Sequence, residues 1–304
     1  MAPRPAPLRT VVLGDLHGSL TAFRTILGRS GLVDGDSWRG GRSILVQLGD
    51  VIDRGPDSIE TYEFLAQLQI RSRKGKGKVV RLLGNHELSL LEGQYDLTNF
   101  PDPGALAERI RTDILGGRVQ AAYAHNGWLF THAGLHMNLL QSVQAEMKAE
   151  KTQRFTLRRL VEHLNRKMKD SVEAGEFKHS IFAVGRARGG ECDTGGIFWA
   201  DFDRELKAPS RAPRFHQVFG HTPEGYEGAR FRQTSDGRRI NIDIGIADAY
   251  GGNLGYLEIL GREAIAHYIV GDHEEIVSLG RAPQAHVRKE PREAPPAEPQ
   301  RKAS

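Results

Sequence analysis

Short apolar runs alternate with amphipathic stretches along the first third of the chain. Three runs rich in Val, Leu and Ile, at residues 10–13, 44–48 and 79–83, have the length and composition of buried strands. Between them, apolar side chains recur every three or four residues, which is the spacing of one face of a helix. This order predicts a parallel sheet covered by helices, with ligands at the carboxyl ends of the strands.

Two helices are predicted between these strands. Their apolar faces are formed by Leu20, Phe23, Ile26 and Leu27 in the first helix and by Ile59, Tyr62, Leu65 and Leu68 in the second. Asp57, followed three residues later by Glu60, has the pattern of a capping box, which predicts that the second helix begins there.

A glycine and polar side chains follow each predicted strand. The blocks are GDLHG at residues 14–18, GDVIDRG at 49–55 and GNHE at 84–87. Glycine at these points allows tight turns and a close approach of the backbone. Because the strands end at one edge of the sheet, the following side chains are expected to converge there: Asp15, His17, Asp50, Asn85 and His86. Asp15 and His17 are two residues apart, so in an extended segment both would point the same way.

Two more histidines, His132 and His221, end apolar stretches further along the chain. Together these residues offer carboxylate, amide and imidazole ligands without a thiolate, a set that suits Mn, Fe or Zn. Each piece alone has a simpler explanation: a capped turn, an Asp–Arg ion pair or a buried core histidine. Their joint occurrence, in order and after predicted strands, indicates a metal site.

Composition limits the class of protein. The chain of 304 residues is 39% hydrophobic and 26% charged, which fits one large globular domain. It contains no apolar run of roughly 18 residues, so no membrane partner is expected, and its first residues lack the apolar stretch of a signal peptide. The single cysteine, Cys192, fits a reducing compartment, and we expect a cytoplasmic enzyme.

The excess positive charge lies mainly at the end of the chain. Residues 281–304 hold six Lys or Arg against three Glu, among Pro and Ala. We therefore expect residues 1–8 and 282–304 to be disordered and residues 9–281 to form one catalytic domain. A second basic cluster, at residues 71–78, contains Gly75 and Gly77 and has the pattern of a solvated loop. No aromatic residue is interleaved with it, which argues against a nucleic-acid partner.

Taken together, the motifs resemble the phosphoprotein phosphatase family of calcineurin-like metallophosphoesterases. The three blocks are followed in order by HAG at residues 132–134 and GHT at 220–222. Residues 164–166, 242–245 and 249–254 are similar to the bacterial, Shewanella-like branch. The resemblance implies an α/β (α+β) fold, a mixed β-sandwich flanked by helices, with a dinuclear metal site at one edge.

The resemblance also implies roles for individual residues. Two divalent ions would be bound, Mn²⁺ by preference and Fe or Zn as alternatives. The first ion would be held by Asp15, His17 and Asp50, and the second by Asp50, Asn85, His132 and His221. His86 with Asp53 would form the catalytic acid pair, while Arg54 and Asn85 would contact the substrate phosphate.

Physical chemistry supports such a site. Two cations about 3.5–4 Å apart can clamp both the attacking water and the phosphoryl oxygens, so that a metal-bound hydroxide attacks phosphorus directly. A bridging carboxylate, here Asp50, is needed to hold two cations so close. The planar fork of Arg54 matches phosphate oxygens, and His86, oriented by Asp53, can protonate the leaving group.

Some residues depart from the family pattern and bear on the substrate. HAG at His132 is similar to the symmetrical dinucleoside tetraphosphate hydrolases, whereas Asp53 and Glu87 are features of protein phosphatases. Pro223 stands where GHxH phosphodiesterases have a second histidine, which disfavours a nuclease. A second phosphate-binding arginine is expected after residue 201, and spacing selects Arg214 over Arg204 and Arg211.

Three functions follow from this pattern. The first is a phosphatase that hydrolyses phosphate monoesters of phosphoproteins or phosphopeptides. The second is a symmetrical dinucleoside tetraphosphate hydrolase. The third, a non-catalytic phosphate-binding module, would require a missing ligand, and none is missing. The sequence leaves open the choice between Ser/Thr and Tyr and the oligomeric state.

Overall fold

A computed structural model describes residues 8–96, 98–150, 155–208 and 215–281. The expectations for residues 1–7, for residues 282–304 and for Arg214 fall outside these ranges. Leu8, which the sequence grouped with the N-terminal segment, is half-buried against the core.

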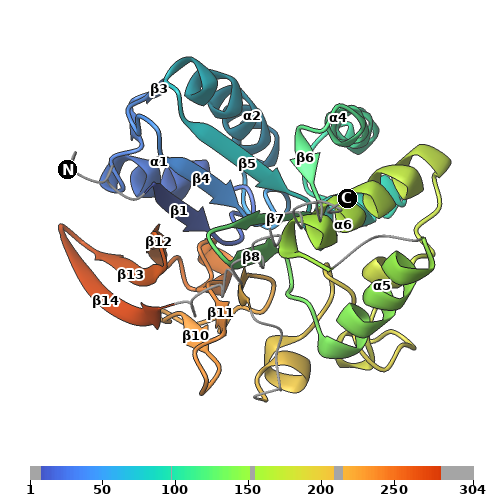
Figure 1. The fold of residues 1–304 in the computed structure, drawn as a ribbon. Helices are drawn as coiled ribbons and strands as arrows, with labels where there is room; N and C mark the ends of the chain where they lie inside the picture. Colours follow the sequence, from blue (N-terminus) through green and yellow to red (C-terminus); the bar gives the residue numbers. More distant parts are fainter. Residues whose placement is uncertain (1–7, 97, 151–154, 209–214, 282–304) are drawn as a thin grey trace, which may run out of the picture.

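The larger of two mixed sheets contains all three strands expected from the first third of the chain. Its strand order is β14-β13-β12-β1-β4-β5-β6 (Figure 1). The strands β1, β4 and β5 are parallel, as predicted, and β6, which was not predicted, pairs parallel with β5. Strands from the end of the chain complete it, because β12 pairs antiparallel with β1. The strands are β1 (Arg9–Leu13), β4 (Ile44–Gln47), β5 (Lys78–Leu82), β6 (Val119–Gln120), β12 (Leu254–Leu260), β13 (Glu263–Val270) and β14 (His273–Arg281).

The second sheet has the order β10-β11-β9-β8-β7. Its central strands β8 and β9 are parallel, and each is followed by one of the downstream histidines. The strands are β7 (Ala122–His125), β8 (Trp128–Thr131), β9 (His216–Phe219), β10 (Arg232–Gln233) and β11 (Arg239–Asn241). A separate hairpin joins β2 (Val33–Asp34) and β3 (Ser37–Trp38).

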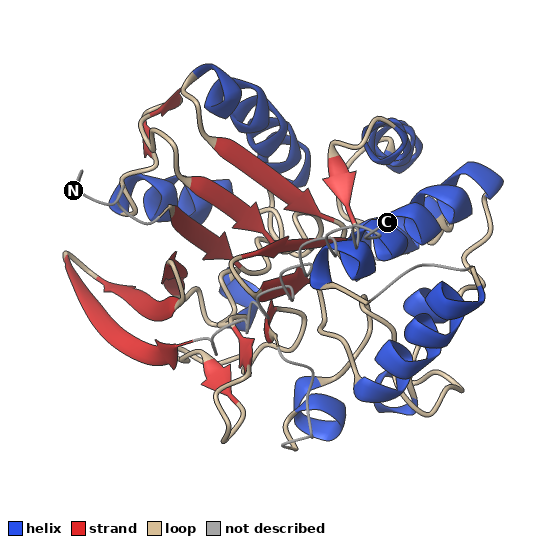
Figure 2. Cartoon of the chain, in the orientation of Figure 1, coloured by secondary structure: helices blue, strands red, loops and turns tan. Residues whose placement is uncertain are grey.

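Helices surround the two sheets (Figure 2). The helix α1 buries Phe23, Ile26 and Leu27, the face expected from its sequence. Further along the chain, α6 packs against β7 and α4. The helices are α1 (Leu20–Arg29), α2 (Ser58–Lys74), α3 (Asn85–Leu91), α4 (Pro103–Leu115), α5 (Met137–Ala149) and α6 (Leu157–Ala174). Short turns of other helix types are η1 (Ser180–Phe182), η2 (Arg186–Arg188), η3 (Phe202–Leu206) and η4 (Asp248–Tyr250).

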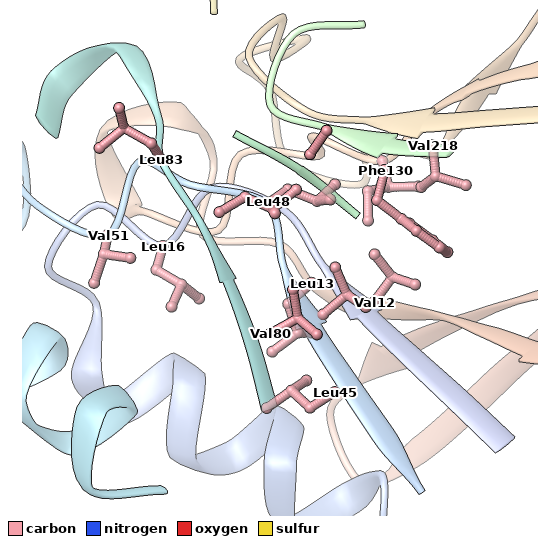
Figure 3. Close-up of a cluster of buried hydrophobic side chains, with 14 of the residues drawn as sticks. Val12, Leu13, Leu16, Leu45, Leu48, Val51, Val80, Leu83, Phe130 and Val218 are labelled. Atoms are coloured by element: carbon pink, nitrogen blue, oxygen red, sulfur yellow. The ribbon is translucent and has the colours of Figure 1, made fainter. Parts of the chain in front are cut away.

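Apolar side chains of the two sheets belong to one core. Figure 3 shows Val12 and Leu13 of β1 near Phe130 of β8 and Val218 of β9, and all four are buried. Burial of such side chains stabilises the fold by about 25 cal/mol per Å² of apolar surface removed from water. Because the two sheets pack together, the carboxyl ends of β1, β4, β5, β8 and β9 lie at the same edge of the sandwich. The predicted mixed β-sandwich flanked by helices is confirmed.

Two local predictions are wrong. Asp57 is the N-cap residue of α2, but its side chain makes no capping hydrogen bond. Its backbone, with ψ of 43°, departs from the extended conformation in which an N-cap carboxylate reaches the first turn. The basic cluster is also not wholly a loop, because α2 continues to Lys74. Arg71, Arg73 and Lys74 therefore occupy the last turn of this helix, where cations interact favourably with the helix dipole.

A buried ion pair connects β5 to α4. Nη1 of Arg81 lies 2.8 Å from Oδ2 of Asp113, and both side chains are almost fully buried. Tyr62 and Arg118 also donate hydrogen bonds to this carboxylate. Burial raises the pKa of Asp113, but Arg81, Arg118 and Tyr62 outweigh it and hold that pKa below its ordinary value.

Arg81→Met is expected to lower the free energy of unfolding by about 3–5 kcal/mol, because it leaves a buried carboxylate without its buried partner. Urea denaturation measures the change. The matched control is Arg109→Met, since Arg109 contacts the same carboxylate at 3.6 Å but is largely exposed. Arg109→Met is expected to lower the free energy of unfolding by at most about 1 kcal/mol. Equal losses in the two variants would contradict a special role for the buried pair.

Candidate metal centre and catalytic site

Loops at the carboxyl ends of five strands converge at one edge of the sandwich. Asp15 and His17 follow β1, Asp50 and Asp53 follow β4, and Asn85 and His86 begin α3 directly after β5. The second sheet contributes the residues after β8 and β9. The buried polar side chains brought to this edge are Asp15, His17, Asp50, Asp53, Asn85, His86, His132 and His221.

Several of these residues have left-handed backbone conformations, which non-glycine residues rarely adopt. The φ angles are 46° at His17, 52° at Asp50, 68° at Asp53 and 72° at His221. Such conformations cost free energy and persist where the surrounding structure enforces them, often at functional sites. The expectation that Asp15 and His17 lie in one extended segment is therefore wrong. The turn at His17 ends the extended backbone, so alternation along a strand does not set the direction of its side chain.

Asp50 lies at the centre of the site. Its Oδ2 is 3.7 Å from Nε2 of His17, and its Oδ1 is 3.6 Å from Nε2 of His132. Two groups of side chains that could hold a metal ion share this carboxylate: His17, Asp50 and His86 form one, and Asp50, His132 and His221 form the other. Burial raises the pKa of Asp50, but the surrounding histidines outweigh it, so the pKa lies below its ordinary value.

The tautomers of His17 and His132 leave one nitrogen of each ring free to bind a cation. Nδ1 of His17 is 3.0 Å from the carbonyl oxygen of Ile52, and Nδ1 of His132 is 3.0 Å from that of Leu48. A carbonyl oxygen only accepts, so each Nδ1 carries the proton and each Nε2 presents a lone pair to the site. Burial lowers the pKa of His17 to about 4, and it lowers the pKa of His132 as well.

The second group has the features of a ligand set. Nε2 of His132 lies 2.9 Å from Oδ1 of Asn85 and 3.2 Å from Nδ1 of His221. Nε2 of His221 is buried and finds no hydrogen-bond partner within the described chain. Burial, and then His132, hold the pKa of His221 well below its ordinary value. Buried neutral imidazoles around a shared carboxylate fit two divalent cations.

Asp15 lies beside these groups. Its two carboxylate oxygens accept the backbone N–H of His221 at 3.2 and 3.1 Å, which ties the end of β1 to the end of β9. The end of β1 also approaches Asp243, which follows β11: a Cβ at Gly14 would lie 3.6 Å from Cα of Asp243. Burial, Asp243 and Asp50, in that order, raise the pKa of Asp15 well above its ordinary value.

His86 and Asp53 form a close pair at the same edge. Nδ1 of His86 lies 2.6 Å from Oδ2 of Asp53, and both side chains are buried. Burial lowers the pKa of His86, but Asp50 and Asp53 outweigh it and raise the pKa above its ordinary value. With Asp53 on Nδ1, the other ring nitrogen is available to the site. The ring centroid of His86 is 4.8 Å from that of His17.

Two arginines lie near the site. Arg54 is exposed, and its charge acts on His17 and Tyr250. Arg188, which the sequence analysis missed, donates a hydrogen bond to Oγ1 of Thr222 at 2.8 Å, and its Nε lies 3.1 Å from Oδ2 of Asp201. Its charge also lowers the pKa of His221. No local motif marks Arg188, because its partner Thr222 is far away along the chain.

Glu87 positions the loop that carries Asp50. Its carboxylate accepts the backbone N–H groups of Asp50 at 3.0 Å, Val51 at 2.7 Å, Ile52 at 3.3 Å and Gly84 at 2.9 Å. One side chain therefore connects the turn after β4 to the start of α3. The GNHE block could have predicted this role, because Glu87 stands three residues after the N-cap glycine, the position from which a Glu side chain reaches back to the start of its helix.

Comparison with known proteins places the chain in a family. The profile of the calcineurin-like phosphoesterases matches residues 8–231, and the chain belongs to this family. It is 40% identical over 90 residues to Shewanella-like protein phosphatase 2 of Arabidopsis thaliana, a match that covers 29% of this chain and 23% of that protein. It is 32% identical over 130 residues to the symmetrical bis(5'-nucleosyl)-tetraphosphatase of Azotobacter vinelandii, covering 40% of this chain and 42% of that enzyme.

A solved structure supports the same fold. The cold-active protein-tyrosine phosphatase of a psychrophilic Shewanella species aligns with a TM-score of 0.62 and covers 90% of this chain and 81% of that one. At 18% identity, this likeness shows the fold alone. The matches to the Arabidopsis and Azotobacter proteins each span less than half of the relative's length, so neither transfers a substrate to this chain. Within the described ranges, no helix is both long and apolar enough to cross a bilayer.

Proposed function

We propose that the chain is a metal-dependent phosphatase that hydrolyses phosphate monoesters of phosphoproteins. The observation that supports it best is the sharing of Asp50 by two groups of ligand atoms, with the His86–Asp53 pair beside them. We assign the first cation to Asp15, His17 and Asp50, and the second to Asp50, Asn85, His132 and His221. Mn²⁺ is the proposed ion, with Fe and Zn as alternatives that the same donors accept.

Two bound cations would supply Lewis acidity toward the phosphate and a water of lowered pKa. Residues of the chain itself would donate the proton and bind the phosphate. Asp53 accepts the Nδ1–H of His86 and stabilises its charge, so that the opposite ring nitrogen can deliver a proton to the departing oxygen. Arg54 offers two N–H groups to phosphate oxygens from the exposed side. Arg188 adds positive charge near His221.

The catalytic unit is proposed to be a single domain of residues 9–281. The pairing of β1 with β12 supports this, because it joins the beginning of the chain to residues beyond the matched family segment. The proposal of one domain can be checked by calorimetric unfolding, which should show one cooperative transition.

The phosphoprotein substrate is supported by the likeness to a Shewanella-like protein phosphatase and by the roles of Asp53 and Glu87. A second candidate, hydrolysis of symmetrical dinucleoside tetraphosphates, is supported by the match to the Azotobacter enzyme and by His132-Ala133-Gly134. Assaying phosphoserine, phosphothreonine and phosphotyrosine peptides beside diadenosine tetraphosphate separates the two. We expect kcat/KM to be higher for a phosphopeptide, and a clear preference for the dinucleotide would refute the proposal.

Arg54→Ala is expected to raise KM for p-nitrophenyl phosphate and to weaken inhibition by free phosphate, both by about tenfold. A charge-assisted hydrogen bond contributes about 1.5–3 kcal/mol, and its loss affects bound substrate and transition state alike. Metal content should stay unchanged. The control is Arg158→Ala, which removes an exposed arginine of α6. Phosphate inhibition equal to that of the unmodified protein would refute the assignment of Arg54.

A further inference from the structure

His221 lies in a strained turn of the backbone. Its φ angle of 72° is left-handed, and the backbone N–H of Thr222 bonds to the carbonyl oxygen of Gly220 at 2.9 Å, across His221. A three-residue turn closed in this way around a positive φ angle is the rare and strained form of the γ-turn. Such a conformation persists only where its surroundings hold it. The residues that hold this turn therefore help to place a proposed ligand of the second ion.

Arg188 bonds to both His221 and the residue that follows it. Its Nη2 donates a hydrogen bond to Oγ1 of Thr222 at 2.8 Å and another to the carbonyl oxygen of His221 at 3.3 Å. Its Nε lies 3.1 Å from Oδ2 of Asp201, and the side chain is 26% exposed. A planar guanidinium presents several donors in a fixed fork, so one side chain can serve these acceptors together. Arg188 thus connects the turn to Asp201.

The loop that carries Arg188, residues 183–196, is closely packed. A Cβ at Gly190 would lie 2.1 Å from the carbonyl oxygen of Val184, so only glycine fits there. The N–H of Gly190 also bonds to the carbonyl oxygen of Gly185 at 3.0 Å. Because the backbone around Arg188 is fixed in this way, less conformational entropy is lost when its side chain makes its bonds.

Thr222 is held by other groups as well. Its Oγ1 also accepts the backbone N–H of Phe202 at 3.2 Å, and its carbonyl oxygen accepts Nδ2 of Asn241 at 2.7 Å. Arg188 differs from these two groups because it bonds to His221 too. Loss of Arg188 should therefore loosen the turn at His221 while the segment around Thr222 keeps its other bonds.

We propose that Arg188 is a positioning residue for the second cation: it stabilises the strained turn and so holds the imidazole of His221 beside His132 before the ion binds. The inference rests on the metal centre of the proposed function and is independent of the substrate. Without Arg188, the turn would relax toward less strained conformations, and the ion would have to restore it. The apparent affinity of a ligand falls with the fraction of protein in the binding-competent conformation, so the second ion would bind more weakly.

The experiment compares wild-type protein with Arg188→Met, which keeps the length of the side chain and removes its hydrogen bonds. Both proteins are stripped of metal with a chelator, dialysed and titrated with Mn²⁺ in a calorimeter. The wild type is expected to bind two ions. In the variant, the affinity of one ion should fall about 10- to 100-fold, the range for residues that support metal ligands, while that of the other stays unchanged. Arg186→Met is the matched control, because Arg186 is an exposed residue of the same loop that pairs with Asp193, and it should change neither affinity.

A double-mutant cycle tests whether Arg188 acts through the turn. Thr222→Val removes the hydroxyl that accepts from Arg188 and nearly keeps the shape of the side chain, so it should weaken the same ion. Because both changes break one hydrogen bond, the double variant should lose less affinity than the product of the two single fold-changes. Independent losses would overturn the proposal. So would wild-type affinity for both ions in folded Arg188→Met or, should that variant not fold, in Thr222→Val.

Two further measurements separate positioning from other roles. As Mn²⁺ is raised, kcat of Arg188→Met should climb toward the wild-type value, because excess metal restores occupancy of the second site. A raised KM or lowered kcat that excess Mn²⁺ does not restore, with wild-type metal affinities, would make Arg188 a substrate contact and overturn the proposal. Equal weakening of both ions, with a lower melting temperature of the metal-free protein, would show a general structural role and overturn it as well.

Failure of this inference is distinguishable from failure of the proposed function. A wild-type protein that binds two Mn²⁺ ions but hydrolyses no phosphate ester would refute the phosphatase, and the titrations would still decide the role of Arg188. A wild-type protein that binds fewer than two ions would refute the metal centre and this role with it.

Discussion

Asp50→Asn is expected to reduce kcat on p-nitrophenyl phosphate by more than about 100-fold and to lower the bound metal below two ions per chain. Asp50 is the only carboxylate among the described residues that belongs to both central groups of ligand atoms, at 3.7 Å from His17 and 3.6 Å from His132. A neutral amide cannot balance two cations. Even residues that only support metal ligands contribute 10- to 100-fold, so a shared ligand should contribute more.

Elemental analysis and steady-state kinetics on the same sample measure both effects. Asp36→Asn is the control, since Asp36 is an exposed carboxylate paired with Arg24 on the surface, and it should leave both values unchanged. An Asp50→Asn protein with two ions per chain and near-normal turnover would refute the bridging role.

His86→Asn is expected to reduce kcat on phosphoserine or phosphotyrosine peptides by about 10²–10⁴-fold, which is the typical contribution of a general acid. The loss on p-nitrophenyl phosphate should be far smaller, because p-nitrophenolate is a good leaving group that departs with little help. The pair of His86 and Asp53, at 2.6 Å, holds the ring in the orientation that proton transfer needs. Asp53→Asn should show a milder form of the same pattern.

The slope of log kcat against leaving-group pKa, at constant metal occupancy, gives the decisive comparison. A steeper slope in His86→Asn than in the wild type supports a proton donor. Equal slopes would rule that role out. Loss of an ion from the variant would instead assign His86 to the metal, as its place beside His17 and Asp50 also allows.

Much of the fold could be predicted because its signals are local. Each of the strands β1, β4 and β5 is a short apolar run followed by a glycine and then Asp or Asn, and their parallel order follows from the helices between them. Because these parallel strands end at one edge of the sheet, the sequence also predicts that Asp50, Asn85 and His86 lie together there. The structure places them together with His132 and His221, whose positions depend on the second sheet.

The remaining features depend on contacts between distant segments, which no local pattern reveals. Asp243 lies near the end of β1 only because β11 and β1 end at the same edge, and Arg188 bonds to Thr222 from a loop without regular spacing. The left-handed backbone at His17 was also unexpected, since alternation in an extended segment is only one of the conformations open to a turn. The choice of Arg214 stays a prediction, because it lies outside the described residues.

The central claim is that two cations on a shared carboxylate make this chain a phosphatase. Its most direct test is to strip the protein with a chelator, add back Mn²⁺ in steps, and measure bound metal and hydrolysis of p-nitrophenyl phosphate at each step. We predict no turnover in the metal-free protein and activity that rises with occupancy of the second ion, reaching its maximum at two ions per chain. Full activity without metal, or with only one ion bound, would contradict the account.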